Sequence, residues 1–347
     1  MNKSQDGGID NIGRVFKLTQ LPANVRTSRR AENFLNRAKR GVSRRLKNWL
    51  LGSRWISHQG QFIYRGRNQE RPIAFNGRNM QFHALYDDCY RYGYELETAV
   101  LLTRLCRGGG AFYDIGANWG YFSLLVAATP EFAGPIFAFE PNPRTHVDLV
   151  DVIQQAGLTD QVKPCAFGLG RESCNMSLAE ADQFQTGYAK LVSSDSGKQI
   201  VVKRLDDLGF PSPQIIKIDA EGMEADILAG GAMLLKNSQP FILFENFLDY
   251  VDPNRTFEPL EWLRERDYQL LVPVLLFTVK GRRVMMTYGI DPNVLISADA
   301  NPKIGLFEVT SENRYLIGLQ LNILAVPKAK MTWLWNSGFI NLNEIRR

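Results

Sequence analysis

From Ala111 onward, the hydrophobic residues gather in short runs that alternate with stretches of helical periodicity. Apolar runs of strand length occupy residues 111–114, 135–140, 162–166, 214–219 and 241–245. Helical patterns occupy residues 121–128, 144–156, 223–235 and 256–266, the last with Thr256 as a candidate N-cap. Strands that are apolar almost throughout and are separated by helices are typical of a parallel sheet covered on both faces. The pattern therefore predicts a doubly wound α/β domain.

The segments around this core are less regular. A helix is predicted over residues 86–107, and the polar, turn-rich residues 168–199 predict a meander or an excursion at the sheet edge. Two late apolar strands, 268–274 and 321–326, have no long helical pattern between them. If these two strands are neighbours, they add an antiparallel edge to a mostly parallel sheet.

The N-terminal quarter has a different pattern. Residues 1–27 are polar and aperiodic, which predicts a flexible tail. From 29 to 51 the apolar residues recur at spacings of three and four with Arg and Lys between them, which predicts a basic amphipathic helix. The predicted organisation has four parts: a tail (1–27), a basic arm with this helix plus loops or short strands (28–85), the α/β domain (86–330) and a C-terminal tail (331–347).

Charge separates the arm from the domain. The first 72 residues hold 16 Lys or Arg and 4 Asp or Glu, a balance of +12, and the whole chain holds 41 and 36. The remainder therefore has 25 basic and 32 acidic residues, a balance of −7. The basic helix has three interpretations: it packs on the domain or is solvated, it lies on an anionic membrane surface, or it binds nucleic acid. The acidic domain disfavours nucleic acid.

Several classes of protein are disfavoured by composition. No apolar run reaches the roughly 18 residues of a membrane span, and the N-terminus lacks the apolar stretch of a secretory signal. The four cysteines lie far apart without metal-ligand spacing, which disfavours a disulfide framework or a zinc site. We therefore expect a reduced, cytoplasmic protein, with contact to the inner face of a membrane through residues 29–51 as an open alternative.

The first strand runs into a glycine-rich turn, Asp114-Ile-Gly-Ala-Asn-Trp-Gly120. Gly116 and Gly120 let backbone N–H groups approach a ligand closely at the start of a helix. Asp114 would accept from a ligand ammonium group or order the turn. The pattern D-x-G-x-N-x-G differs from the G-x-G-x-x-G dinucleotide fingerprint. It therefore favours S-adenosylmethionine, which has no pyrophosphate, and we expect Trp119 to pack behind the turn rather than face the cofactor.

Acidic residues stand at the ends of three later strands. Glu140 follows Gly120 by 20 residues, where a carboxylate binds ribose hydroxyls. Asp219 and Glu221 end the fourth strand, and Glu245 ends the fifth. If the methyl acceptor is an alcohol, Asp219 is our first candidate for the base and Glu221 the second. The alternative is that Asp219 or Glu221 caps the following helix.

Three motifs together resemble those of the FkbM-like methyltransferases. They are Asp114-Ile-Gly-Ala-Asn-Trp-Gly-Tyr-Phe-Ser-Leu124, Phe139-Glu-Pro-Asn-Pro143 and Ile216-Lys-Ile-Asp-Ala-Glu-Gly-Met-Glu-Ala-Asp226, and the resemblance extends from Tyr94 to Lys328. It implies a Rossmann-like class I methyltransferase fold with seven strands and an antiparallel last strand. It also implies S-adenosylmethionine as methyl donor and, usually, transfer to a hydroxyl.

The resemblance also implies roles for individual residues. Cofactor contacts are expected from Glu95, Asp114, Gly116, Ala117, Asn118, Gly120, Tyr121, Glu140, Pro141, Asn142, Ala166, Phe167 and Asp219. Acceptor contacts are expected from Glu221, Glu245 and His83, although a structural role for His83 is an alternative. A divalent metal held by Asp219, Glu221 and Glu245 is an alternative, and the prediction is that none is bound.

The predicted function is S-adenosylmethionine-dependent O-methylation of a hydroxyl on a glycan, a glycolipid or another small-molecule acceptor. Two alternatives remain: an RNA methyltransferase that uses the basic arm as a phosphate anchor, and a catalytically inactive scaffold of the same fold. The chain lacks the Asn/Asp-Pro-Pro-Tyr/Phe motif of amino-directed nucleic-acid enzymes, which disfavours the RNA reading. The sequence leaves the acceptor and the oligomeric state open.

Overall fold

The central feature of the protein, seen in a computed structural model, is one large sheet. The structure describes residues 12, 14–27, 56–87, 93–179, 190–192, 198–276, 278–287, 289–291, 304–317 and 320–345. The sheet comprises β4 (Ala111–Ile115), β5 (Ile136–Phe139), β6 (Val162–Cys165), β11 (Pro213–Ile218), β12 (Phe241–Phe247), β13 (Tyr268–Leu275), β14 (Ile304–Glu308), β15 (Gln320–Pro327) and β16 (Ile340–Asn341). Their order is β16-β14-β13-β15-β12-β11-β4-β5-β6.

The strand directions confirm the predicted class I methyltransferase fold. From β6 to β12 every neighbouring pair is parallel, and β15 is antiparallel to both β12 and β13. The two late strands, β13 and β15, are adjacent and antiparallel, which confirms that part of the prediction. They do not form the edge, because β15 inserts between β12 and β13 and the sheet continues through β14 and β16. Periodicity identifies strands but carries no information on which distant strands pair.

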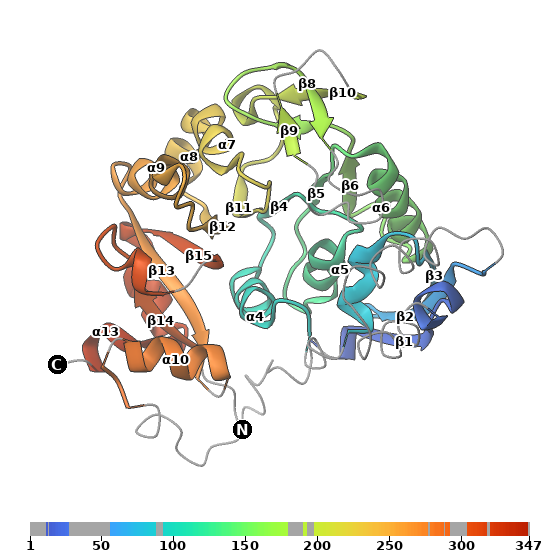
Figure 1. The fold of residues 1–347 in the computed structure, drawn as a ribbon, viewed down its shortest axis with the longest axis horizontal. Helices are drawn as coiled ribbons and strands as arrows, with labels where there is room; N and C mark the ends of the chain where they lie inside the picture. Colours follow the sequence, from blue (N-terminus) through green and yellow to red (C-terminus); the bar gives the residue numbers. More distant parts are fainter. Residues whose placement is uncertain are drawn as a thin grey trace.

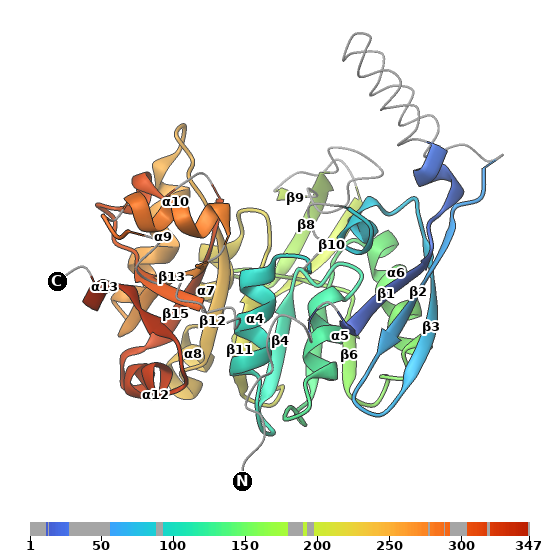
Figure 2. The same ribbon diagram turned by 90° about the horizontal axis from the view of Figure 1, so that it is seen from below.

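Helices cover both faces of the sheet (Figures 1 and 2). One buried cluster joins the sheet to α4 (Leu96–Leu105), α5 (Tyr121–Ala128) and α6 (Pro143–Gln155). The other joins the opposite face to α7 (Glu224–Gly230), α8 (Ala232–Ser238), α9 (Pro253–Arg264) and α10 (Val279–Thr287). The near-continuous apolar strands are explained by this double coverage.

Three helix boundaries differ from the sequence prediction. Helix α4 begins only at Leu96, after Glu95 in the left-handed region at φ 41°. The helix predicted over 223–235 is two helices, which meet at Gly231, at φ −110° and ψ 18°. Glycine is destabilising in a helix interior. The N-cap of α9 is Asp252; the Thr256 hydroxyl instead donates to the Phe247 carbonyl oxygen at 2.9 Å.

An antiparallel sheet and a short helix precede the main domain. Strands β1 (Phe16–Gln20), β2 (Gln59–Arg65) and β3 (Glu70–Asn76) pair in the order β1-β2-β3, and the 3-10 helix η1 (Met80–Leu85) follows. We call residues 16–20 and 59–85 the N-terminal layer; it packs beside α5 and α6 (Figure 1).

The N-terminal sheet bears on two predictions for this part of the chain. The flexible tail predicted over 1–27 is wrong for residues 16–20, which form β1 because β2 supplies the backbone partners that an isolated segment lacks. The short strands predicted as one option in the arm are present as β2 and β3. The amphipathic helix predicted over 29–51 lies outside the described residues.

The C-terminal residues also belong to the domain. They form η6 (Lys328–Lys330), α12 (Met331–Asn336), β16 and α13 (Leu342–Ile345), and β16 pairs parallel with β14. Leu334 and Leu342 are fully buried. The predicted tail over 331–347 is therefore wrong for these residues, because elements this short have no detectable period but still bury apolar side chains.

The residues after β6 leave the main sheet. Strands β7 (Gly168–Leu169), β8 (Cys174–Ala179), β9 (Lys190–Val192) and β10 (Lys198–Lys203) form a separate sheet in the order β7-β10-β8-β9. Since strands that are consecutive in the chain are not all neighbours, this is the predicted excursion and not a meander. Short 3-10 helices follow at η4 (Leu205–Asp207) and, before β15, at η5 (Arg314–Leu316). Among the described helices, none is long and apolar enough to cross a membrane.

Candidate functional site

A cavity of about 540 Å³ opens where the parallel strands end. The segments that follow β4, β5, β6 and β11 line it, together with residues of η1, the start of α4 and the start of β15. Its volume is within the range of small-molecule sites, and the carboxyl edge of a doubly wound sheet is where such folds bind ligands. We therefore ask which of the predicted site residues line this cavity.

The turn after β4 approaches the end of β11 closely. Gly116 has φ 75°, and a Cβ on it would come within 1.8 Å of the Asp219 backbone oxygen. The N–H groups of Gly116 and Ala117 both donate to the Phe139 carbonyl oxygen at 3.0 Å. Asn118, at φ 51°, accepts from the Trp119 N–H through its side-chain oxygen at 2.8 Å. Only glycine fits at 116, and the turn is locked to both neighbouring strand ends.

Asp114 lies beneath this turn and outside the cavity lining. Its side chain is fully buried, and Oδ2 accepts from the Ser123 hydroxyl at 2.7 Å. Oδ1 has no hydrogen-bond partner among the described residues. Burial raises the pKa of the Asp114 carboxyl above its usual range. Of its two predicted roles, the geometry favours ordering the start of α5; Gly120 likewise stands outside the lining.

Glu140 lies in the cavity wall with both carboxyl oxygens occupied. They accept from the backbone N–H of Asn118 at 3.0 Å and of Asn142 at 2.8 Å. The side chain is almost completely buried, and this burial raises its pKa to about 7 in spite of the two N–H donors. Pro141 and Asn142 line the cavity beside it, as predicted.

The raised pKa of Glu140 predicts a pH dependence of cofactor binding. A ligand whose ribose hydroxyls donate to Glu140 needs the carboxylate, so affinity should rise as pH rises through 7. Calorimetric titration with S-adenosylmethionine is expected to show roughly tenfold weaker binding at pH 6 than at pH 8. Glu140→Gln, which cannot ionise, should bind more weakly at both values and lose the difference. A pH-independent wild type would contradict the assigned role.

A buried lysine faces the carboxylates of the site. Lys217 on β11 has its Nζ 3.0 Å from Asp219 Oδ2 and is directly opposite Asp114 in the sheet register. Asp219, Asp114 and Glu95 together raise the pKa of Lys217 above its usual value, outweighing the opposing effect of burial. Sequence reasoning assigned Lys217 no role. A single lysine within an otherwise apolar strand was the available signal, because lysine is buried only when paired.

Removing Lys217 should cost stability in a pH-dependent way. In Lys217→Met the neighbouring carboxyls lose their counter-charge, so their pKa values rise in the folded state relative to the unfolded state. Stability is then present at low pH and is lost as pH rises. We expect a loss of roughly 2 kcal/mol at pH 8 and a smaller loss at pH 5, by urea denaturation. Equal losses at the two pH values would contradict this charge assignment.

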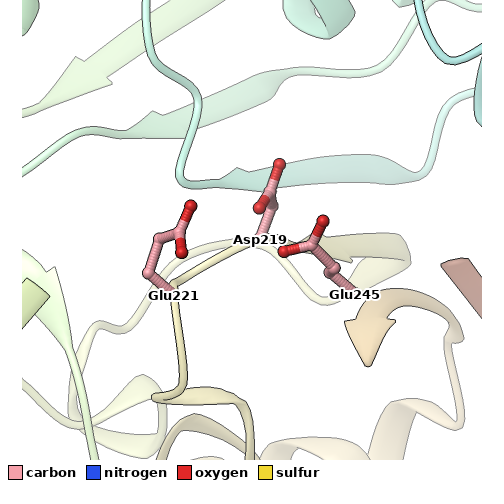
Figure 3. Close-up of side chains that lie close together, drawn as sticks. All are labelled: Asp219, Glu221 and Glu245. Atoms are coloured by element: carbon pink, nitrogen blue, oxygen red, sulfur yellow. The ribbon is translucent and has the colours of Figure 1, made fainter. Parts of the chain in front are cut away.

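Three carboxylates converge beside Lys217 (Figure 3). Asp219, Glu221 and Glu245 each present an oxygen within 4.8 Å of the others, a spacing that could hold a metal ion. Glu245 accepts a hydrogen bond from the Gln320 side chain, and burial together with the Asp219 charge raises its pKa to about 8. The absence of a metal stays a prediction.

The capping alternative for these acids is not what the structure shows. Glu224, the first residue of α7, accepts at Oε1 from the N–H groups of Ala220 and Gly222 in the preceding turn, both at 3.2 Å. Helix α7 has Met223 as N-cap without a side-chain bond. Asp219 instead pairs with Lys217, which places its carboxylate in the cavity wall.

The remaining predicted residues divide into those that line the cavity and those that do not. Glu95 lines it and accepts from Asn322 Nδ2 at 3.1 Å, a partner on β15 that the sequence did not indicate. The lining also includes Tyr121, Phe167 and His83. The Nδ1 atom of His83 lies 2.7 Å from the Met80 carbonyl oxygen. Ala166, which follows the last residue of β6, is exposed and stands outside the lining, so its cofactor contact stays a prediction that the cavity does not support.

Known proteins resemble this chain over the same region. Residues 114–270 match the family model described as the methyltransferase FkbM domain. A hexuronic acid methyltransferase, AglP of Haloferax volcanii, is 28% identical over 155 residues, which are 44% of this chain and 62% of the relative. The match thus spans less than two thirds of that relative's length.

Solved structures are more distant. A methyltransferase FkbM from Methylobacillus flagellatus is 19% identical, with 47% of this chain and 39% of that chain covered and a TM-score of 0.36. An O-methyltransferase from Bacillus cereus is 15% identical, with 67% and 80% covered and a TM-score of 0.37. These TM-scores are too low to support a conclusion about the activity of this chain. The family match supports the predicted cofactor, S-adenosylmethionine, and the part of the chain that resembles an FkbM methyltransferase domain is residues 114–270.

Proposed function

We propose that this chain transfers the methyl group of S-adenosylmethionine to a hydroxyl group of a carbohydrate or another small-molecule acceptor. The observation that carries the proposal is the position of Asp219. Its carboxylate is paired with buried Lys217 and stands in the cavity wall that the 114–120 turn and Glu140 also form. A cofactor site and a candidate base thus share one cavity.

The residues present fit the donor. Glu140 is placed for the ribose hydroxyls, and Gly116 leaves the backbone of the turn accessible where a side chain would collide with Asp219. The carboxylates of Glu95, Asp219 and Glu245 suit a ligand that carries a sulfonium and an ammonium charge. When bound, S-adenosylmethionine supplies a methyl group on a positively charged sulfur.

The chain's own contribution is alignment and proton removal. With donor and acceptor bound, the cavity would hold the acceptor oxygen in line with the methyl carbon, and such alignment is a large source of the rate of a displacement. The carbon–sulfur bond breaks with its electron pair remaining on sulfur, and the new bond forms to the acceptor oxygen. Asp219 takes the hydroxyl proton. Glu221, Glu245 and His83 bind the other polar groups of the acceptor.

The acceptor class is proposed on two grounds. The relative from Haloferax volcanii is named as a hexuronic acid methyltransferase, so a protein with a related domain acts on a sugar derivative. The part of the cavity around Glu245 is lined by carboxylates and by the amides of Gln320 and Asn322, groups that hydrogen-bond to hydroxyls.

Label transfer tests this function. Small-molecule, glycan, lipid and RNA fractions from cells are incubated with methyl-labelled S-adenosylmethionine and either the full chain or Asp219→Asn, and products are analysed by mass spectrometry. The proposal is supported if the unaltered chain labels an oxygen of a carbohydrate or another small molecule and Asp219→Asn does not. Label in RNA, or no transfer in spite of cofactor binding, would overturn it.

A further inference from the structure

We infer that the N-terminal layer is part of the cofactor site, and that Trp119 is the positioning residue through which the layer and the methyl donor stabilise each other. The inference rests on the proposed function, since it requires that S-adenosylmethionine binds at the 114–120 turn. It assigns a role to a part of the chain that lies outside the matched residues 114–270.

Trp119 belongs to the turn, but its side chain is held by the N-terminal layer. The indole is 2% exposed and stacks on Phe82, with ring centroids 4.7 Å apart. Its edge contacts Phe16 on β1 and Phe62 on β2, at 6.0 and 5.9 Å between centroids. The indole N–H donates to the Gln81 carbonyl oxygen at 3.1 Å. Aromatic contacts and one directional bond therefore link the cofactor turn to this layer.

The layer also reaches the cavity directly. Met80, Gln81 and His83 of η1 line it together with Trp119, so η1 and the turn residue border the same space that a ligand would fill. The residue before Trp119 donates its backbone N–H to Glu140, the predicted ribose ligand. A ligand that holds Glu140 and the turn consequently restrains Trp119, and through it η1.

The layer has a second anchor that does not involve the turn. The Tyr64 hydroxyl donates to the Leu124 carbonyl oxygen of α5 at 3.2 Å. Gln155 on α6 accepts from the Ala74 N–H at 2.7 Å and donates to the Ala74 carbonyl oxygen at 3.1 Å. The N-terminal layer is thus held by contacts to the turn and, independently, by hydrogen bonds to helices α5 and α6. Either set can be weakened without removing the other.

Hydrogen exchange of the full chain tests the coupling without an activity assay. With saturating S-adenosylmethionine, the amides of η1 and of β2 and β3 are expected to exchange several-fold more slowly, and those of α12, away from the cavity, to be unchanged. Protection of the turn without protection of η1 would overturn the inference and leave the proposed function standing. No protection and no calorimetric binding would overturn both.

Two matched variants separate positioning from stability. Trp119→Phe keeps an aromatic ring and removes the indole donor, whereas Tyr113→Phe removes a buried hydroxyl outside the layer, which donates to the Pro211 carbonyl oxygen at 2.9 Å. We expect Trp119→Phe to weaken S-adenosylmethionine binding about fivefold and Tyr113→Phe to leave it within twofold, each measured by calorimetry beside its Tm. Unchanged binding in Trp119→Phe, or equal weakening in both variants, would overturn the inference.

Discussion

Replacing Asp219 by Asn is expected to lower the rate of methyl transfer by about 1,000-fold, the contribution of a well-placed general base. Asparagine has nearly the same shape but cannot take the hydroxyl proton. Binding of S-adenosylmethionine should change only a few-fold, because Gly116 and Glu140 are untouched. The measurements are single-turnover transfer of label to the acceptor that the label-transfer experiment identifies, and calorimetry with S-adenosylmethionine.

The neighbouring acids provide the control for this variant. Glu221→Gln changes another carboxylate of the same cluster and leaves the ion pair between Asp219 and Lys217, at 3.0 Å, in place. We expect it to reduce transfer by roughly tenfold, mainly by raising the KM of the acceptor. If Glu221→Gln loses more activity than Asp219→Asn, the roles of the two residues are reversed. If Asp219→Asn keeps more than a tenth of the rate, no base acts at Asp219.

Gly116→Ala is expected to abolish measurable binding of S-adenosylmethionine. The new Cβ would lie 1.8 Å from the Asp219 backbone oxygen, so either the turn or the end of β11 has to move. The contact is with backbone and cannot be relieved by a side-chain rotation. We expect affinity to fall more than 100-fold and the free energy of unfolding to fall by about 3 kcal/mol, by calorimetry and urea denaturation.

Gly209→Ala separates the collision from backbone strain. Gly209 has φ 64°, close to the 75° of Gly116, but a Cβ on it would meet nothing within 4 Å. Its substitution should cost about 1 kcal/mol of stability and leave cofactor affinity unchanged. If the two variants lose affinity equally, the close approach of the turn to β11 has no part in binding.

Much of the main sheet was predictable from sequence because its elements are long or strongly patterned. Helix α5 was predicted with its observed bounds, and the parallel strands from β4 to β12 within a few residues. Their apolar runs follow from burial on both faces, which is a local property of each run. Strands β1 and β16 have no continuous apolar run of this kind, and both were assigned to tails.

The candidate site shows the same division. Glu140 and Asp219 were found because strand ends in a doubly wound sheet gather at one edge, whatever the rest of the chain does. Ala166 was assigned from its place in a motif, and the direction of its side chain was not knowable from that. Gln320 and Asn322 were missed because they reach the cavity only through the insertion of β15 beside β12.

The sequence by itself determined the fold class, the cofactor turn and the acids at the strand ends, since each depends on a local pattern. Only the tertiary structure decided that Lys217 pairs with Asp219 and that Asp114 lies beneath the turn. It also decided that Trp119 is buried against Phe82 of the N-terminal layer. These are contacts between segments distant in the chain, and their free energy depends on packing and desolvation that no local pattern records.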